Sequence, residues 1–443
     1  MDESLSLNTR IVVTARRAGL RSGADNVVEL LLRLQAPDAP PGHAAQRAPQ
    51  ALALVVDRSG SMAGQPLAEA RRCADHLIGS LRASDRVALV QFDGQAKLLW
   101  PAHPLGDAQA LRAALAGMQA GGQTNLHGGW LAGARALGDV GGQGLRRVML
   151  LSDGCANVGE TGSEAIAAQC AEWAARGVTT STYGLGRNFN EDLMLAMARA
   201  GGGNAYYGDG AEDLMEPFEQ ELSLLGNLCL RELRLAARPG EGIALRLLND
   251  LPHADGRWQW PDLAWGAEAW AVLRLNVPRD ALPPTGRPMR LLHVEVDART
   301  PAGEPVRVER VALSLPVLGV GAFDALADDE AVTRRIVEVA AGDALARIRV
   351  AADAGDWPGV ERRLDEAMRQ FDGNAWVAAM LQAMREIAAT REARHMKKEL
   401  LFASRKLHVR LSAIREGDLG GPDAQADVQA FLRRKPVQGK GKP

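Results

Sequence analysis

Five oxygen-bearing side chains stand in three short motifs that lie far apart along the chain. Asp57, Ser59 and Ser61 lie in the stretch DRSGS, Thr124 lies in GGQTN, and Asp153 lies in LSDG. The set holds two carboxylates and three hydroxyls and includes no histidine or cysteine. Hard divalent cations prefer oxygen ligands, and Mg²⁺ takes six of them in near-octahedral geometry. The residue types therefore predict a site for Mg²⁺, with Mn²⁺ or Ca²⁺ as alternatives, provided that the fold brings the three motifs together.

A cation held by five protein groups or fewer would keep one coordination position open. A carboxylate from a partner protein could fill that position. Two unit charges roughly 4 Å apart attract by about 4 kcal/mol at an effective dielectric of about 20, before the cost of desolvation. The double charge of the metal strengthens this attraction, so one Asp or Glu of the partner could decide binding.

The residues around the motifs predict the elements that would position them. Short apolar runs at 51–56, 86–92, 146–152, 178–184 and 205–208 alternate with helix-period stretches at 66–81, 163–176, 191–200 and 212–225. This alternation predicts an α/β fold: a doubly wound, mostly parallel sheet with helices on both faces. In such a sheet, the loops at the carboxyl ends of the strands meet where the strand order reverses. Two of the motifs directly follow predicted strands, so we expect the five side chains to converge there.

The three motifs closely resemble those of the von Willebrand factor type A (VWA) family. Asp57, Ser59 and Ser61 match its D-x-S-x-S motif, Thr124 matches its lone threonine, and Asp153 matches its second aspartate before glycine. The resemblance covers about 50–225 and implies an intact metal-ion-dependent adhesion site (MIDAS). It further implies that the serines, and often the threonine, bind Mg²⁺ through their hydroxyls, while the aspartates act through water. In the family a carboxylate of the bound protein completes the shell.

The flanking sequence has a different period. Apolar β-type runs at 9–15, 27–34, 228–235, 269–277, 290–296 and 306–315 are separated by turns, and 324–415 is helical in pattern. Because two strands alone are marginal in water, the two early runs are expected to join the later ones in one β-sandwich. We predict a discontinuous β-sandwich of 1–48 plus 226–320, a VWA domain at 49–225 inserted in it, a helical domain at 321–416 and a flexible basic tail at 417–443. The flanks resemble a bacterial and eukaryotic group with this arrangement, here of the bacterial cytoplasmic type.

Composition excludes several classes of protein. The formal net charge is −2, which argues against general nucleic-acid binding. The N-terminus starts with acidic residues and lacks a signal-peptide pattern, and no apolar run is long enough to span a membrane. The four cysteines have no zinc-site spacing, which suggests thiols in a reducing compartment. A cytoplasmic protein is the expectation, without the RING finger of plant relatives or the secretory route of the inter-alpha-trypsin inhibitor heavy chains.

Some features allow two interpretations. Asn125 and His127 could line the rim of the site, although capping of the next helix is favoured, and Cys155 is interpreted as a small loop residue rather than a redox-sensitive thiol. The four tryptophans at 258, 260, 265 and 270 could form a recognition surface, but core packing is favoured. Residues 391–415 hold eight basic and two acidic side chains, which favours a solvated helix face over a site for an acidic partner.

Enzyme motifs are missing from the sequence. It contains no G-x-S-x-G elbow and no phosphate-binding P-loop, and no histidine or cysteine pair stands out with a base to activate it. We therefore predict a non-enzymatic, Mg²⁺-dependent module that binds an acidic residue of a partner protein. The alternatives are an adaptor subunit of an AAA-type ATPase assembly and, less favoured, a metal-dependent hydrolase.

Overall fold

The computed structural model describes residues 8–408, except for 41–48, 107, 139, 141–144, 187–188 and 209–210. Within these ranges the chain divides into two compact units. One unit comprises residues 40, 49–228 and 301–303, and the other combines residues 8–39, 229–300 and 304–408. The first unit is therefore inserted, in sequence, between two parts of the second. The predicted tail at 417–443 lies outside the described residues, and the other predicted domain boundaries stay predictions.

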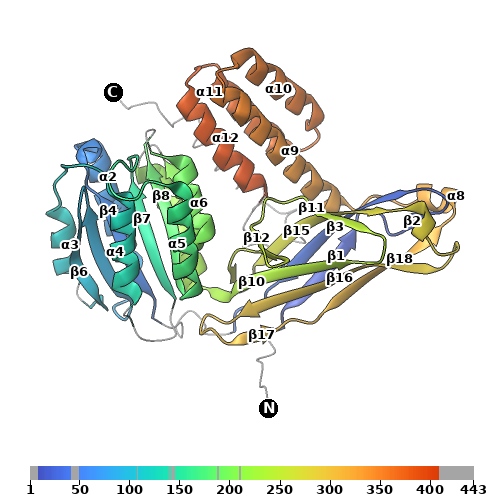
Figure 1. The fold of residues 1–443 in the computed structure, drawn as a ribbon, viewed down its shortest axis with the longest axis horizontal. Coiled ribbons are helices and arrows are strands. Elements are labelled where there is room, and N and C mark those ends of the chain that lie inside the picture. Colours follow the sequence, from blue (N-terminus) through green and yellow to red (C-terminus); the bar gives the residue numbers. More distant parts are fainter. Residues whose placement is uncertain are drawn as a thin grey trace. The chain divides into compact units, whose positions relative to one another are not determined.

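The inserted unit is built on a mixed sheet with the strand order β6-β5-β4-β7-β8-β9 (Figure 1). Neighbouring strands pair in parallel, except for β5 and β6, which are antiparallel. The strands of this sheet are β4 (Ala51–Asp57), β5 (Arg86–Phe92), β6 (Ala96–Pro104), β7 (Arg146–Ser152), β8 (Val178–Leu185) and β9 (Gly202–Gly208). The central strand β4 is buried at every residue, as expected for a parallel strand that is covered on both faces.

Helices cover both faces of this sheet. Alternate residues of β4 belong to two different apolar cores, because successive side chains of a strand point to opposite faces. One core includes α2 (Gln65–Ser80), α3 (Gln109–Ala116) and α7 (Ala211–Gly226). The other includes α4 (Leu126–Gly138), α5 (Ser163–Ala175) and α6 (Glu191–Ala200). The sheet is therefore the middle layer of three.

A charged pair lies inside this unit. Arg147 of β7 and Glu221 of α7 form an ion pair, and the two side chains are 1% and 0% exposed. Glu221 also accepts hydrogen bonds from Ser181 Oγ (2.6 Å), Asn204 Nδ2 (2.8 Å) and Tyr206 Oη (2.7 Å). Burial alone would raise the pKa of Glu221, but the Arg147 charge and these hydrogen bonds outweigh burial and lower it. The carboxylate is thereby kept charged and ties α7 to three strands.

The second unit contains two further sheets. A four-stranded antiparallel sheet has the order β1-β3-β15-β11, formed by β1 (Arg10–Ala15), β3 (Asn26–Gln35), β15 (Glu268–Val277) and β11 (Ala244–Leu247). The other sheet has the order β12-β13-β10-β16-β18-β2, with β14 and β17 at its sides. Its strands are β2 (Leu20–Arg21), β10 (Leu228–Pro239), β12 (His253–Ala254), β13 (Arg257–Gln259), β14 (Leu263–Ala264), β16 (Pro288–Arg299), β17 (Pro305–Arg307) and β18 (Val311–Leu318).

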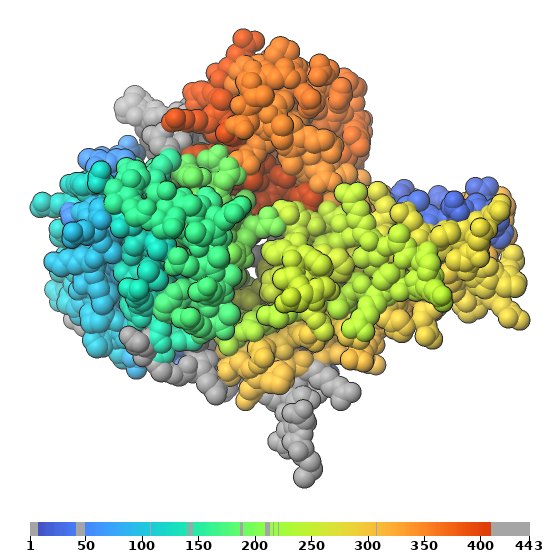
Figure 2. Space-filling model, in the orientation of Figure 1, coloured from blue at the N-terminus to red at the C-terminus, as the bar shows by residue number. Residues whose placement is uncertain are grey.

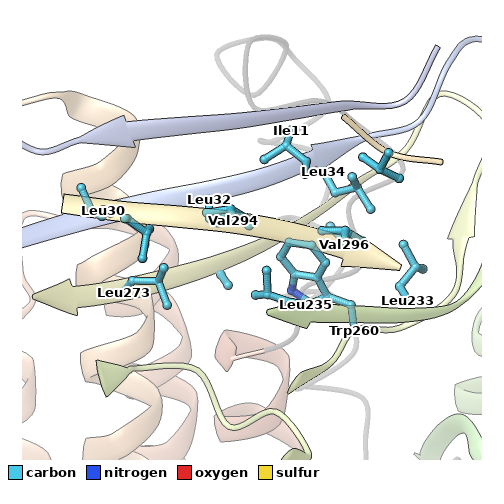
Figure 3. Packing of buried hydrophobic residues seen from close by; sticks show 14 of the residues in the cluster. Ile11, Leu30, Leu32, Leu34, Leu233, Leu235, Trp260, Leu273, Val294 and Val296 are labelled. Carbon is cyan, nitrogen blue, oxygen red and sulfur yellow. The ribbon is translucent and has the colours of Figure 1, made fainter. Parts of the chain in front are cut away.

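One apolar core holds these two sheets together (Figure 3). It combines Leu30, Leu32 and Leu34 of β3 with Val294 and Val296 of β16. Early and late parts of the chain therefore contribute to one core, while the β-sandwich of 1–48 plus 226–320 stays a prediction. The tryptophan cluster belongs mainly to the interior: Trp260 and Trp270 are 1% and 4% exposed, and Trp260 Nε1 donates to the Trp270 carbonyl (3.2 Å).

A helical region follows the last strand. It comprises α8 (Val320–Asp324), α9 (Glu330–Asp353), α10 (Trp357–Gln370), α11 (Ala375–Ala388) and α12 (Ala393–His408), and α9 to α12 form one orange and red body in Figure 2. Asp356 caps α10 by accepting a hydrogen bond from Gly359 N (2.9 Å), next to the proline that marked this helix start in the sequence. Asn374 caps α11 by accepting from Val377 N (3.1 Å).

This helical region is anchored on the four-stranded sheet. The Arg335 guanidinium of α9 lies 4.3 Å from the Trp270 ring centroid, and Asn249 Nδ2 donates to the His408 carbonyl at the end of α12 (2.7 Å). The favoured interpretation of 391–415 as a solvated helix face is wrong for part of α12, because Lys398 and Glu399 are buried.

The predicted fold class is confirmed: an α/β unit with a mostly parallel sheet is accompanied by further sheets and a C-terminal helical region. Among the described residues, no helix is long and apolar enough to cross a bilayer. The elements β6, α3 and α4 of the inserted unit were not predicted from the sequence.

Candidate functional site

The three predicted motifs meet at the carboxyl edge of the central sheet. β4 lies between β5 and β7, so the strand order reverses between β4 and β7. Asp57 is the last residue of β4, and Asp153 directly follows β7. The short 3-10 turn Gly60–Met62 follows Asp57 and carries Ser61. Parallel strands bring their carboxyl ends to one edge, so the two aspartates come to the same place at the switch point.

Hydrogen bonds connect four of the five predicted side chains. Ser59 Oγ lies 3.2 Å from Ser61 Oγ, and Ser61 Oγ donates to Asp153 Oδ1 (2.8 Å). Asp57 Oδ1 accepts from the Ser59 backbone N–H (2.8 Å), and Asp57 Oδ2 accepts from the hydroxyl of Ser152 (2.5 Å). The structure therefore brings Asp57, Ser59, Ser61 and Asp153 into one connected group, with Ser152 as an unpredicted member.

Thr124 reaches the same place from the loop before α4. Gly154 shows that Thr124 lies close to Asp57, because a Cβ built on Gly154 would lie 3.4 Å from Thr124 Oγ1 and 3.5 Å from Asp57 Oδ2. Gly154 thus stands beside both oxygens, and a side chain there would fill the space next to them. All five predicted side chains are together at this site.

The charges of the two aspartates are poorly compensated by the protein. Asp57 is fully buried, and this desolvation raises its pKa to about 6 despite the hydrogen bonds from Ser152 and Ser59. Desolvation also raises the pKa of Asp153, although Ser61 donates to it. The positive charge of a divalent cation would stabilise the charged form of both carboxylates.

The donor spacing fits a hard cation. Oxygens that share one Mg²⁺ at about 2.1 Å lie about 3 Å apart along the edges of an octahedron. The distance of 3.2 Å between the Ser59 and Ser61 hydroxyl oxygens is close to this value, and Asp153 Oδ1 lies beside Ser61 Oγ at hydrogen-bond distance (2.8 Å). In the described part of the chain, no three His, Cys, Asp or Glu side chains form a group that could hold a metal. A metal here would therefore depend on the hydroxyls.

Two residues that were not predicted brace the loops around the site. Arg58 forms an ion pair with Asp93, the residue that follows β5, and also donates to the Gln119 carbonyl (2.8 Å). Gly122 has a φ of +84°, and a Cβ there would lie 3.1 Å from Asp93 Cβ, so glycine suits this close approach. Asp93 could have been found from its place after a predicted strand, at the same edge of the sheet.

Of the two neighbouring residues expected to cap the next helix, Asn125 does so and His127 does not. Asn125 Oδ1 accepts from Gly128 N (2.8 Å), which is a helix-capping contact at the start of α4. His127 lies within α4, where Nε2 is 3.1 Å from Gln169 Oε1. Cys155 is exposed in the loop after Asp153.

Comparison with known proteins identifies the domain family of the inserted unit. The sequence pattern of the von Willebrand factor type A domain matches residues 51–220. These residues form a VWA domain. Such domains typically mediate interactions between proteins.

Curated relatives match less than half of this chain. The uncharacterized protein YfbK of Escherichia coli is 30% identical over 174 residues, which is 39% of this chain and 30% of YfbK. An uncharacterized protein of Synechocystis is 27% identical over 199 residues, which is 43% of this chain and 45% of the relative. The chain thus spans less than half the length of these relatives.

Solved structures extend the likeness of the fold beyond the VWA domain. A von Willebrand factor type A protein from Catenulispora acidiphila superposes with a TM-score of 0.68 at 18% identity, covering 91% of this chain and 98% of that chain. The ArnB paralog VWA2 from Sulfolobus acidocaldarius superposes with a TM-score of 0.56 at 15% identity, covering 90% and 99%. At these identities the likeness concerns the fold alone, but it includes the sheets and helices outside the VWA domain.

Proposed function

We propose that the VWA domain binds an acidic side chain of a partner protein through a divalent cation, Mg²⁺ in preference to Mn²⁺ or Ca²⁺. Asp57, Ser59, Ser61, Thr124 and Asp153 would hold the cation, as in an intact MIDAS. The observation that supports this proposal most strongly is the group of oxygen-bearing side chains at the switch point, where neighbouring oxygens lie 2.8 and 3.2 Å apart. The cation would supply an electrophilic centre with a position for an external carboxylate.

The five side chains differ in how accessible they are to solvent. Asp57, Ser59, Thr124 and Asp153 are nearly inaccessible, whereas Ser61 is exposed. The four buried donors would therefore bind the cation from the protein interior. A partner would approach the cation from the solvent side, next to Ser61. A partner would reach the cation with an extended acidic side chain, and desolvation around the buried donors would strengthen the attraction between them.

A binding role is supported over an enzymatic one. Within the described residues, the hydrogen bonds of the Ser59 and Ser61 hydroxyls connect these residues with each other and with Asp153. None of these bonds leads to a histidine, lysine or cysteine that could act as a general base, which hydrolytic use of a serine would need. In the alternative, the partner is an AAA-type ATPase, and this protein would serve as its adaptor through the same site. A cytoplasmic location remains part of the proposal.

Titration calorimetry with Mg²⁺ on the full chain tests the cation site. We expect binding by the wild type, and loss of at least about tenfold in affinity for Asp57→Asn and Ser61→Ala, since each removes or weakens one donor. Asp75→Asn and Ser80→Ala are matched controls, because both residues lie at the surface of α2. A wild type that does not bind Mg²⁺, or a loss of equal size in the controls, would contradict the site.

Capture from a lysate then tests the binding role. We expect partners that are retained with Mg²⁺, released by EDTA and lost in Asp57→Asn but not in Asp75→Asn. Recovery of an ATPase under these conditions would favour the adaptor role. Identical recovery with Mg²⁺ and with EDTA would refute binding through the cation.

A further inference from the structure

The backbone of Thr124 is held by a residue of a different loop. The Thr124 N–H donates to Asn157 Oδ1 (2.8 Å), and the Thr124 carbonyl accepts from Asn157 N (3.0 Å) and Val158 N (3.3 Å). Both backbone polar groups of Thr124 are thus satisfied by the segment that follows Asp153. We call residues 153–159 the clamp loop.

The clamp loop also contacts the residue after Thr124. Gly159 has a φ of +75°, and a Cβ there would lie 2.5 Å from Asn125 Oδ1, so only glycine permits this approach without displacement. Asn125 is held from two other directions as well, because its N–H donates to the Asp93 carbonyl (2.7 Å) and its Oδ1 accepts from Gly128 N (2.8 Å). The end of the Thr124 loop is therefore fixed to the loops after β5 and β7.

The rest of the Thr124 loop is held mainly through its backbone, including the Gln119 carbonyl that accepts from Arg58. It is rich in glycine at 121–122, and these residues are tied to the first motif by single backbone hydrogen bonds, Gly121 N to the Arg58 carbonyl (2.8 Å) and Gly60 N to the Gly122 carbonyl (3.0 Å). Without the Asn157 side chain, the Thr124 N–H would lose its partner and the loop would gain conformational freedom. Ordering the loop again would then cost free energy when the cation binds.

From these contacts we infer that Asn157 is a positioning residue that sets the cation affinity of the site. This inference rests on the proposed function. Asn157 and Asp153 belong to the same clamp loop, so Asn157 couples the position of the Thr124 hydroxyl to that of the Asp153 carboxylate. Outer residues that orient metal ligands typically contribute a factor of about 10 to 100 in metal affinity.

The test compares Asn157→Ala with Asn157→Asp in the full chain. Asn157→Ala removes the acceptor of the Thr124 N–H, whereas Asn157→Asp keeps an acceptor oxygen at the same distance along the side chain. Asn374→Ala is the matched control, because Asn374 Oδ1 also accepts a backbone N–H, from Val377, but at a helix cap in the other unit. Mg²⁺ affinity is measured by titration calorimetry, and amide exchange of peptides containing Thr124 is measured in EDTA.

We expect Asn157→Ala to weaken Mg²⁺ binding by roughly tenfold or more and to speed exchange at Thr124. Asn157→Asp should restore slow exchange and bring the affinity to within about threefold of the wild type, and Asn374→Ala should change neither. If Asn157→Asp restores Mg²⁺ affinity and slow exchange, the effect of Asn157→Ala is due to the lost acceptor and not to a general loss of stability.

Three results would overturn the inference. Unchanged Mg²⁺ affinity in Asn157→Ala, beside a wild type that binds Mg²⁺, would refute the positioning role and leave the proposed function intact. An Asn157→Asp variant as weak as Asn157→Ala would show that the acceptor is not what matters. A wild type that does not bind Mg²⁺ would refute the proposed function itself, and with it the role of Asn157.

Discussion

Removal of the buried carboxylate of Glu221 should be the most costly single change in the VWA domain. Glu221→Ala leaves the Arg147 charge buried without its partner and removes the acceptor of three further hydrogen bonds. Breaking a buried ion pair in this way costs about 3–5 kcal/mol, which is a large part of the stability of an ordinary domain. Asp75→Ala is the comparison, because Asp75 pairs with Arg112 at the surface, where both side chains are about half exposed. That change should cost less than about 1 kcal/mol.

Amide exchange in strands β7 and β8 measures this difference. Exchange of these strands reports the free energy of opening of the VWA domain alone, whereas heat unfolding of a chain with two units does not give one defined value. Equal losses in Glu221→Ala and Asp75→Ala would refute the argument from burial. The double variant Arg147→Ala with Glu221→Ala should cost less than the sum of the two single changes, because the second change removes the charge that the first left unpaired.

The same carboxylate makes the domain sensitive to acid. The pKa of Glu221 is lower in the folded chain than its ordinary value, so its stabilising contribution is complete above the unfolded pKa of about 4.3. That contribution is lost as the pH falls through the folded value. Opening free energies of Glu221→Ala should therefore depend less on pH below about 4.3 than those of the wild type.

Three further changes test the packing. Gly203→Ala would place a Cβ 2.2 Å from the Thr180 carbonyl oxygen, so exchange should rise throughout β9, and a β9 as protected as in the wild type would contradict this contact. Trp260→Ala should lower the free energy of opening of the second unit by about 3–5 kcal/mol, as read from amide exchange in β10 and β16, and a loss below about 1 kcal/mol would mean that Trp260 is not a core residue. Asn249→Ala removes the bond to the His408 carbonyl, so exchange at the end of α12 should rise by a factor that corresponds to about 1–3 kcal/mol, while α10 stays unchanged.

The strands of the VWA domain could be predicted because their burial is continuous. The predicted ranges 86–92 and 146–152 coincide with β5 and β7, which are buried over most of their length and covered on both faces. β6 escaped prediction because it is an edge strand with mostly exposed or half-buried residues, and it contains two prolines. Its pairing with β5 is a tertiary property that leaves no apolar run in the sequence.

Helix α4 is hard to predict because its glycines argue against a helix when the sequence is considered alone. The structure gives them a packing reason. A Cβ on Gly129 would lie 2.4 Å from the Phe92 ring, and a Cβ on Gly133 would lie 2.5 Å from Val55 Cγ2. The glycines let α4 lie close to the sheet, and close packing outweighs the low helix propensity.

The convergence of the five side chains could be predicted, because two of the three motifs follow apolar runs that are recognisable as buried strands, and parallel strands end at one edge of a sheet. Two of the supports could not be, since Asn157 and Ser152 act through contacts with residues that are 33 and 95 positions away in the sequence. Asn157 carries no motif signal of its own, and its bond to the Thr124 N–H becomes visible only when β7 and the loop before α4 are placed together.

The insertion of the VWA domain between β3 and β10 sets an order of synthesis. β3 pairs with β15 along ten residues, and Gln35 Nε2 donates to Glu268 Oε2 across 233 residues of chain (2.8 Å). At about 5–20 residues per second, β3 waits about 10–50 s for its partner, while β1 alone gives it only a marginal hairpin. The VWA domain is complete before β15 leaves the ribosome and can fold first. The apolar strand β3 is then the part of the nascent chain most exposed to wrong pairing, and the one a chaperone would need to cover.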